Sequence, residues 1–243
     1  MRGRELWHLL TNETNAEARV AFQRAIELDS NFAPAYALLA ITHMRDYLNQ
    51  WSTSPALSLE EGYKVAQEAV ARSDRDPYAH WALGSLYLWL RRHDEAEREL
   101  ERAISLNPSF SLGYTLLGLT LHYAGRSEKA LDCFEHAIAL DPHTDVYLHF
   151  HSQAYFQLGR YEKDVQVLKR RLTRHPDTDI SRVLLAASLG HLGRPDEARA
   201  QWQEVFRINP NYSLEHRRKV LPYKNPTDFE LVVEGLRKAG IEP

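Results

Sequence analysis

Twelve histidines are the residues of this 243-residue chain that could most readily bind a metal ion or transfer protons. His149 and His151 stand two positions apart, so on a helix their side chains point to different faces and cannot easily share one ion. His122 and His149 could meet from neighbouring segments, but no carboxylate or thiolate set accompanies them. We therefore predict neither a bound metal nor a cofactor.

Catalytic and nucleic-acid-binding patterns have little support in the sequence. There is no glycine-rich phosphate loop, no paired His-Glu zinc motif and no nucleophile elbow. Cys133 is the only cysteine, so no internal disulfide forms, and its setting favours a small packing residue. The basic runs 169–171 and 216–219 are typical of solvated faces, and the formal net charge of −3 does not favour nucleic acid. The prediction is a protein that is not an enzyme and has no nucleic-acid partner.

A fixed interval of 34 residues organises most of the chain. It separates four prolines and, independently, three glycines: Pro108, Pro142, Pro176 and Pro210; Gly125, Gly159 and Gly193. Each interval contains two stretches whose apolar residues follow a 3.6-residue period. A repeat of this length is typical of paired helices stacked into a solenoid. The glycines are expected to take positive φ where the first helix of each pair ends.

The residues inside each interval resemble the tetratricopeptide repeat family. The clearest unit carries the family residues at set offsets: His80, Leu83-Gly84, Tyr87, Ala96, Leu100, Ala103 and Pro108. The fifth unit departs most, with Asp164 and Arg171 where the pattern has alanine. The resemblance implies an all-α, right-handed superhelical solenoid of antiparallel helix pairs over residues 1–212, about six pairs in all. It also implies a protein-interaction scaffold.

The first two units and the tail are irregular. Residues 18–30 match a second helix, with Arg4–Leu10 as its shortened partner. The second unit holds about ten extra residues, which we place in an inserted loop near 46–58 that contains Trp51. Ser58 with Glu61 fits a capping box that would restart the helix there. Trp51 either serves binding or tucks against its own repeat.

Residues 213–243 are expected to form C-terminal capping helices, because the end of a solenoid needs a shield. The last of them is predicted over Thr227–Ala239, with an apolar stripe that includes Phe229 and Leu236 and a stop at Gly240.

Both ends of the chain also resemble the C-terminal repeat modules of bacterial class III adenylate/guanylate cyclases. Residues 2–4 and 14–19 carry the likeness at the start, and 221–226 with 235–240 carry it near the end. The resemblance implies an accessory module of a bacterial nucleotide-cyclase signalling system. It implies no cyclase activity, because the metal-binding aspartates and purine-selecting residues of a catalytic domain are missing from these 243 residues.

In this architecture the first helix of each pair lines an inner surface, which would here be rich in aromatic and histidine side chains. Such a surface suits a protein or peptide partner, although rings at helical spacing can equally pack as ordinary core. The predicted groove residues are Tyr78, Trp81, Trp89, Thr115, His122, Tyr123, His149, Phe150, Gln153, Gln157 and His191.

The alternative is a regulatory module that binds a small molecule or self-associates, which leaves a homo-oligomer open. Some members of the resembled family use repeated Lys and Asn residues to bind the C-terminal carboxylate of a chaperone. The predicted groove lacks these residues, which argues against that role here. No apolar run reaches the roughly 18–20 residues that span a bilayer, so we predict no membrane insertion and a cytoplasmic location.

Overall fold

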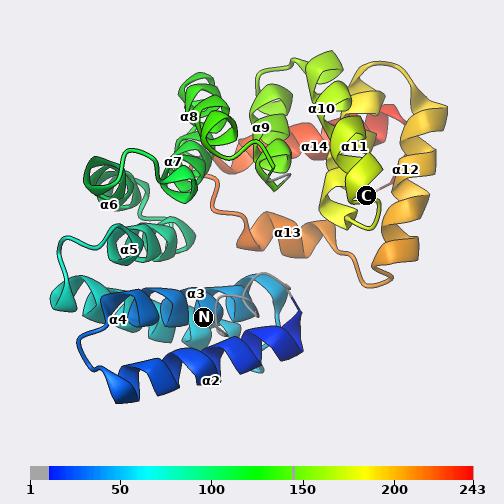
Figure 1. Ribbon diagram of the computed structural model, residues 1–243. Helices are drawn as coiled ribbons and strands as arrows, with labels where there is room; N and C mark the ends of the chain where they lie inside the picture. Colours follow the sequence, from blue (N-terminus) through cyan, green and yellow to red (C-terminus); the bar gives the residue numbers. More distant parts are fainter. Residues whose placement is uncertain (1–10, 144–145, 243) are drawn as a thin grey trace. The chain divides into compact units, whose positions relative to one another are not determined.

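The computed structural model describes residues 11–143 and 146–242 (Figure 1). These residues form α-helices and one short 3-10 helix, with no strand among them, which confirms the all-α solenoid. The helices are α2 Asn12–Leu28, α3 Ala33–Asn49, α4 Pro55–Arg72, α5 Pro77–Trp89, α6 His93–Leu106, α7 Ser111–Tyr123, α8 Ser127–Leu140, α9 Val146–Gln157, α10 Tyr161–Arg174, α11 Asp179–His191, α12 Pro195–Ile208, α13 Leu214–Val220, η1 Pro226–Phe229 and α14 Glu230–Lys238. The chain divides into two compact units between Leu117 and Gly118, within α7.

The first unit packs α2 on α3, α3 on α4 and α5 on α6, and it also brings the first helices α3 and α5 together. Small residues allow these helices to approach closely. A Cβ added to Gly84 of α5 would lie 2.7 Å from Leu100 Cγ of α6, so glycine is needed for this contact. The predicted partner Arg4–Leu10 of the first pair lies outside the described residues.

The prediction of an inserted loop near 46–58 is wrong in its length. The break between α3 and α4 covers only residues 50–54, and the extra residues lengthen the two helices to 17 and 18 residues. The predicted capping box fails for the same reason: Ser58 lies inside α4, where its backbone N–H donates to Ser54 O at 3.1 Å. Pro55 accounts for the earlier start, because proline suits the first turn of a helix.

The second unit repeats the arrangement with α9 on α10 and α11 on α12. Gly125, Gly159 and Gly193 follow the first helices with φ of 80°, 68° and 68°, as predicted. Arg91 occupies the corresponding place of the first unit with φ of 60°, a conformation that is strained for a residue with a Cβ. No described helix has an apolar stretch long enough to cross a bilayer.

The last helix, α14, caps the second unit by packing on α11, and this confirms the predicted capping helix. The two backbones nearly touch. A Cβ on Gly190 would lie 1.8 Å from Gly235 O, and one on Gly235 would lie 2.4 Å from Ala187 O. Both positions therefore require glycine, and Gly240 ends the helix with φ of 72°.

Candidate functional site

A segment of the chain itself covers the inner face of the second unit. We call residues 213–225 the tail segment; it contains α13 and the extended stretch that leads to η1 (Figure 1). The Lys224 backbone N–H donates a hydrogen bond to Tyr123 O, at the end of α7, over 2.8 Å. The Tyr223 ring stands edge-on to the ring of Tyr123 at 4.8 Å and lies 5.7 Å from that of His122. The tail segment thus occupies the surface where a partner was predicted to bind.

Burial under the tail segment changes the chemistry of the predicted groove residues. His122 and Tyr123 are only 1% and 2% exposed. Burial lowers the pKa of His122 to about 4 and raises the pKa of Tyr123 to about 12, so both are neutral near pH 7. The prediction that these side chains face an open groove is therefore wrong for the chain as it folds.

His149 is held neutral by its surroundings. Its Nδ1 lies 3.1 Å from Ser181 Oγ, which also accepts a hydrogen bond from Arg171 Nε at 3.1 Å. Burial, and then the positive charge of Arg171, lower the pKa of His149 to about 3. Because Ser181 Oγ already accepts from Arg171, we assign its hydroxyl hydrogen to His149 Nδ1. The ring proton of His149 then lies on Nε2.

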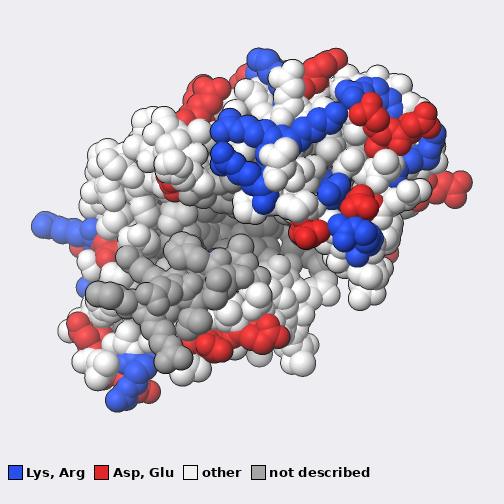
Figure 2. Space-filling model, turned by 45° about the vertical axis from the view of Figure 1, so that its right-hand side comes forward, with Lys and Arg blue, Asp and Glu red and all other residues white. Residues whose placement is uncertain are grey.

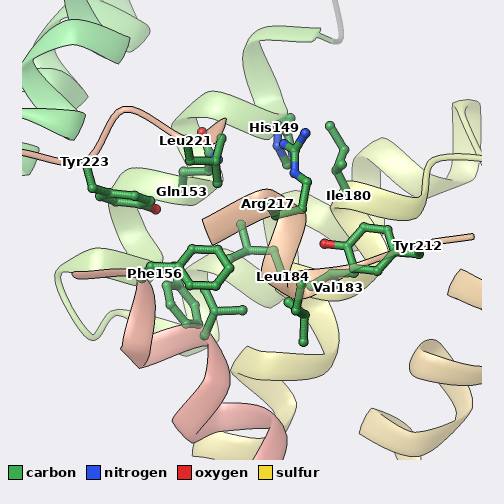
Figure 3. A pocket seen from close by; sticks show the side chains of 13 residues that line it. His149, Gln153, Phe156, Ile180, Val183, Leu184, Tyr212, Arg217, Leu221 and Tyr223 are labelled. Atoms are coloured by element: carbon green, nitrogen blue, oxygen red, sulfur yellow. The ribbon is translucent and has the colours of Figure 1, made fainter. Parts of the chain in front are cut away.

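Below the tail segment lies a small pocket with apolar walls and a few polar groups (Figure 3). Its volume is about 40 Å³, enough for roughly three water-sized groups. The lining residues are His149, Gln153, Phe156, Ile180, Val183, Leu184, Tyr212, Leu214, Arg217, Leu221, Tyr223, Phe229 and Val232. Arg217 is the only charged residue in this set.

The remaining predicted groove residues of this unit are half-buried. The His191 ring stacks on Tyr161 at 4.3 Å with parallel planes, and its Nε2 lies 2.8 Å from Leu231 O, so it joins α11 to the C-terminal elements. The Phe150 ring is nearly parallel to that of Phe134, with centroids 6.4 Å apart. Gln157, at the end of α9, is neither fully exposed nor buried. The structure thus brings His122, Tyr123, His149 and Gln153 under the tail segment and leaves these three elsewhere.

In the first unit the predicted groove aromatics belong to the core. Trp81 is 3% exposed and packs against Tyr78 and Phe110, with ring centroids 6.2 Å away in both cases. Trp89 packs on the same core from its edge, and Thr115 is 2% exposed with its hydroxyl bonded to Ser111 O. These residues therefore pack as ordinary core, which was the alternative to a binding groove.

Trp51 of the insertion is half-buried, and its backbone N–H donates to Asp46 O at 3.1 Å. This bond follows the left-handed residue Gln50, with φ of 54°, which ends α3.

A buried carboxylate marks the fifth unit. Asp164 is fully buried at the position that holds Ala96, Ala130 and Ala198 in the other units. Its oxygens accept hydrogen bonds from the hydroxyls of Ser152 and Ser188. Burial raises the pKa of Asp164 from 3.8 to about 7, and the two hydroxyls offset part of that shift.

Sequence reasoning treated the tail segment as a cap and missed the side chains by which it lines the pocket, Arg217, Leu221 and Tyr223. A signal was present: Leu214, Arg217 and Leu221 are spaced by three and four residues and share one face of a helix. That face lines the pocket. Leu214 and Arg217 on this stripe are half-buried, and Leu221 is buried.

The outer surface carries charges of both signs. Figure 2 shows Lys and Arg side chains beside Asp and Glu over the upper right of the view. On α12 neighbouring charges pair along the helix: Arg194 with Glu197, Arg199 with Asp196 and Arg207 with Glu204. Within the described residues no three His, Cys, Asp or Glu side chains are placed to hold a metal ion.

Comparison with known proteins places this arrangement in a class. A family model described as Tetratricopeptide repeat matches residues 77–110. A second, described as Anaphase-promoting complex, cyclosome, subunit 3, matches residues 123–205. Together with the 34-residue period and the stacked helix pairs, these matches define a helical-repeat protein of the protein-interaction class. The chain is a tetratricopeptide repeat protein.

Two curated relatives are much longer than this chain. "Putative adenylate cyclase 3" of Rhizobium meliloti (strain 1021) is 42% identical over 228 residues, which are 94% of this chain and 39% of that protein. Anaphase-promoting complex subunit 3 of Schizosaccharomyces pombe (strain 972 / ATCC 24843) is 28% identical over 135 residues, 54% of this chain and 19% of that protein. The chain therefore spans less than half the length of either relative.

Solved structures share the fold. The APC/C hetero-tetramer Cut9-Hcn1 superposes with a TM-score of 0.71 at 17% identity, over 92% of this chain and 40% of that one. YrrB, described as a TPR protein with an unusual peptide-binding site, gives a TM-score of 0.53 at 16% identity, over 82% of this chain and 97% of its own. Identities this low relate the folds alone.

Proposed function

We propose that the chain is a non-catalytic scaffold that binds a peptide or short helix on the inner face of the second unit, where the tail segment lies. The proposal is based on the observation that this face already binds a peptide segment, the tail segment of the chain itself. It accepts a backbone hydrogen bond at Tyr123 O and surrounds the Tyr223 ring with aromatic groups. A surface that binds one short helix with an extended continuation has the geometry to bind another.

The fit of the tail segment leaves polar groups without partners, which supports exchange for a different occupant. His122 Nε2 and Gln153 Oε1 are buried and have no hydrogen-bond partner among the described residues. A buried polar atom without a partner costs about 1–3 kcal/mol. A partner that supplies a donor to Gln153 and an acceptor or donor to His122 would recover that free energy and compete with the tail segment.

Release of the tail segment need not unfold the unit. The following helix, α14, is held to α11 by its own contacts, which include the Gly190–Gly235 approach and the bond from His191 to Leu231 O. Movement of residues 213–225 is therefore separable from the cap. The partner that fits is a segment with an aromatic side chain in an extended stretch, as in Leu221-Pro222-Tyr223.

The test uses the full chain and a fluorescent peptide that copies residues 211–226. Tyr223→Ala removes the ring that packs on His122 and Tyr123, so this variant should bind the peptide at least tenfold more tightly than the wild type. Lys219→Ala is the matched control, because Lys219 lies on the same helix, is 71% exposed and pairs with Glu215. Fluorescence anisotropy measures binding, and circular dichroism checks that the variants fold.

Equal, weak binding by both variants would contradict the proposed surface. If Tyr223→Ala does not fold, Leu221→Ala takes its place with the same expectation, because Leu221 also lines the pocket below the tail segment.

We also propose that the scaffold serves a nucleotide-cyclase signalling system, as the name of its 42% identical relative suggests. The matched region is a minority of that relative, so its remaining part is the natural candidate for a partner in the same system. Titration of this chain with that remaining part, followed calorimetrically, should show binding that Tyr223→Ala alters. Absence of heat with both proteins would count against this role.

A further inference from the structure

We infer that the pocket below the tail segment is a binding site for a small monocarboxylate with an apolar body. The site exists only while the tail segment is in place, because Arg217, Leu221 and Tyr223 of that segment line it. Its geometry combines one unpaired cation, several hydrogen-bond donors and a wall of aliphatic and aromatic side chains (Figure 3).

The cation is Arg217. It is half-buried, and its guanidinium makes no hydrogen bond or ion pair with any residue in the described parts of the chain. Its neighbour Arg218, by contrast, pairs with Glu230 at 2.9 Å on the outer surface. A partly buried arginine without a counter-ion is uncommon, because desolvation is normally offset by an acidic partner. Among the described residues, no Asp or Glu lines the pocket.

Further polar groups line the same pocket. Figure 3 shows Arg217 rising toward His149, with Tyr212 and Tyr223 on opposite sides of the pocket and their hydroxyl oxygens turned toward its middle. The Tyr212 hydroxyl has no hydrogen-bond partner in the described residues. Because Nδ1 of His149 faces Ser181, its Nε2–H can donate a hydrogen bond to a ligand. A set of donors around one positive charge is complementary to a carboxylate.

The buried amide adds a second constraint. Gln153 is 9% exposed and lines the pocket, and its Oε1 atom has no hydrogen-bond partner in the part of the chain that the structure describes. A bound acid that keeps a water or a donor group beside its carboxylate would satisfy this oxygen.

Size and polarity narrow the class of ligand. The pocket holds about 40 Å³, close to three water-sized groups, which matches the three heavy atoms of a carboxylate and excludes a nucleotide. The remaining walls are apolar, with Phe156, Val183 and Leu214 among them. The ligand body is therefore no larger than a methyl or ethyl group, and inorganic phosphate lacks the apolar part.

The test measures binding of acetate and propionate to the full chain by saturation-transfer NMR and calorimetry. The neutral propionamide and inorganic phosphate are the chemical controls. The wild type should bind both acids and neither control. Arg217→Gln should weaken acid binding about tenfold or more, since it removes a charge-assisted hydrogen bond.

The matched control is Arg218→Gln, which removes the same charge from the adjacent position and should bind like the wild type. Tyr212→Phe, which deletes one donor only, should weaken binding several-fold, and it stands in if Arg217→Gln fails to fold. Three results would overturn the site: no acid binding by the wild type, equal binding by Arg217→Gln, or equal affinity for the amide and the acid.

Discussion

The buried carboxylate of Asp164 makes the stability of the second unit depend on pH in a defined window. Its pKa is raised from 3.8 in an unfolded chain to about 7 in the folded one, chiefly by burial. Between these values the folded protein binds a proton that the unfolded chain does not. The free energy of unfolding therefore falls as pH rises through this window, and the loss is complete about one unit above the folded pKa, at about pH 8.

Asp164→Asn removes the titration and keeps the size of the side chain. From pH 5 to pH 7 the wild type should lose about 2 kcal/mol relative to the variant, because slightly less than two pH units at 1.36 kcal/mol each count once the folded carboxyl is half ionised at pH 7. Above about pH 8 the difference should stay constant. The Ser152 and Ser188 hydroxyls can turn to accept from the new amide, so the variant should fold.

Urea denaturation at pH 5, 6, 7 and 8 measures the difference between the two proteins. His122 and His149, with pKa values lowered to about 4 and 3, act in the opposite direction: the unfolded chain binds their protons first, so stability falls as pH drops below 6.5. Both histidines are present in both proteins and cancel in the difference. Asp132→Asn, at an exposed position of α8, is the control. Parallel curves for wild type and Asp164→Asn would refute the reasoning.

Two further predictions concern packing. Trp81→Ala should lower the free energy of unfolding by about 3–5 kcal/mol, because the ring is 3% exposed within the first core; a loss below about 1 kcal/mol in urea denaturation would contradict this. Gly190→Ala should displace α14 from α11, since the new Cβ would lie 1.8 Å from Gly235 O. Gly159→Ala is its control, with no atom within 4 Å and only the strain of φ at 68°, about 1 kcal/mol. Limited proteolysis should cut α14 in the first variant and leave it intact in the second.

The sequence predicts the repeat architecture well because the architecture is local. A proline and a glycine at fixed offsets punctuate each helix pair, and the glycines at 125, 159 and 193 take the positive φ expected of them. The predicted loop was too long because most of the extra residues extend α3 and α4. Counting residues between repeat positions cannot distinguish a longer helix from a longer loop.

The candidate site was harder to predict, because it depends on contacts between segments far apart in the chain. Helical periodicity places His122 and His149 on the inner face, but it does not show what covers that face. The cover is Tyr223, about 100 residues from His122 and in a stretch broken by Pro222. In the first unit, Trp81 follows the same periodicity and is core, because Phe110 fills the space beside it.

The close approach of α14 to α11 also limits how such a protein can change in evolution. Repeat arrays lengthen when a unit is duplicated and the copy stacks on its neighbour. Here the side of α11 that Gly190 opens is already taken by the backbone at Gly235. A unit duplicated at this end could stack on α11 only if α14 were displaced. We therefore expect relatives of this protein to gain or lose units before α11 and to retain both Gly190 and Gly235.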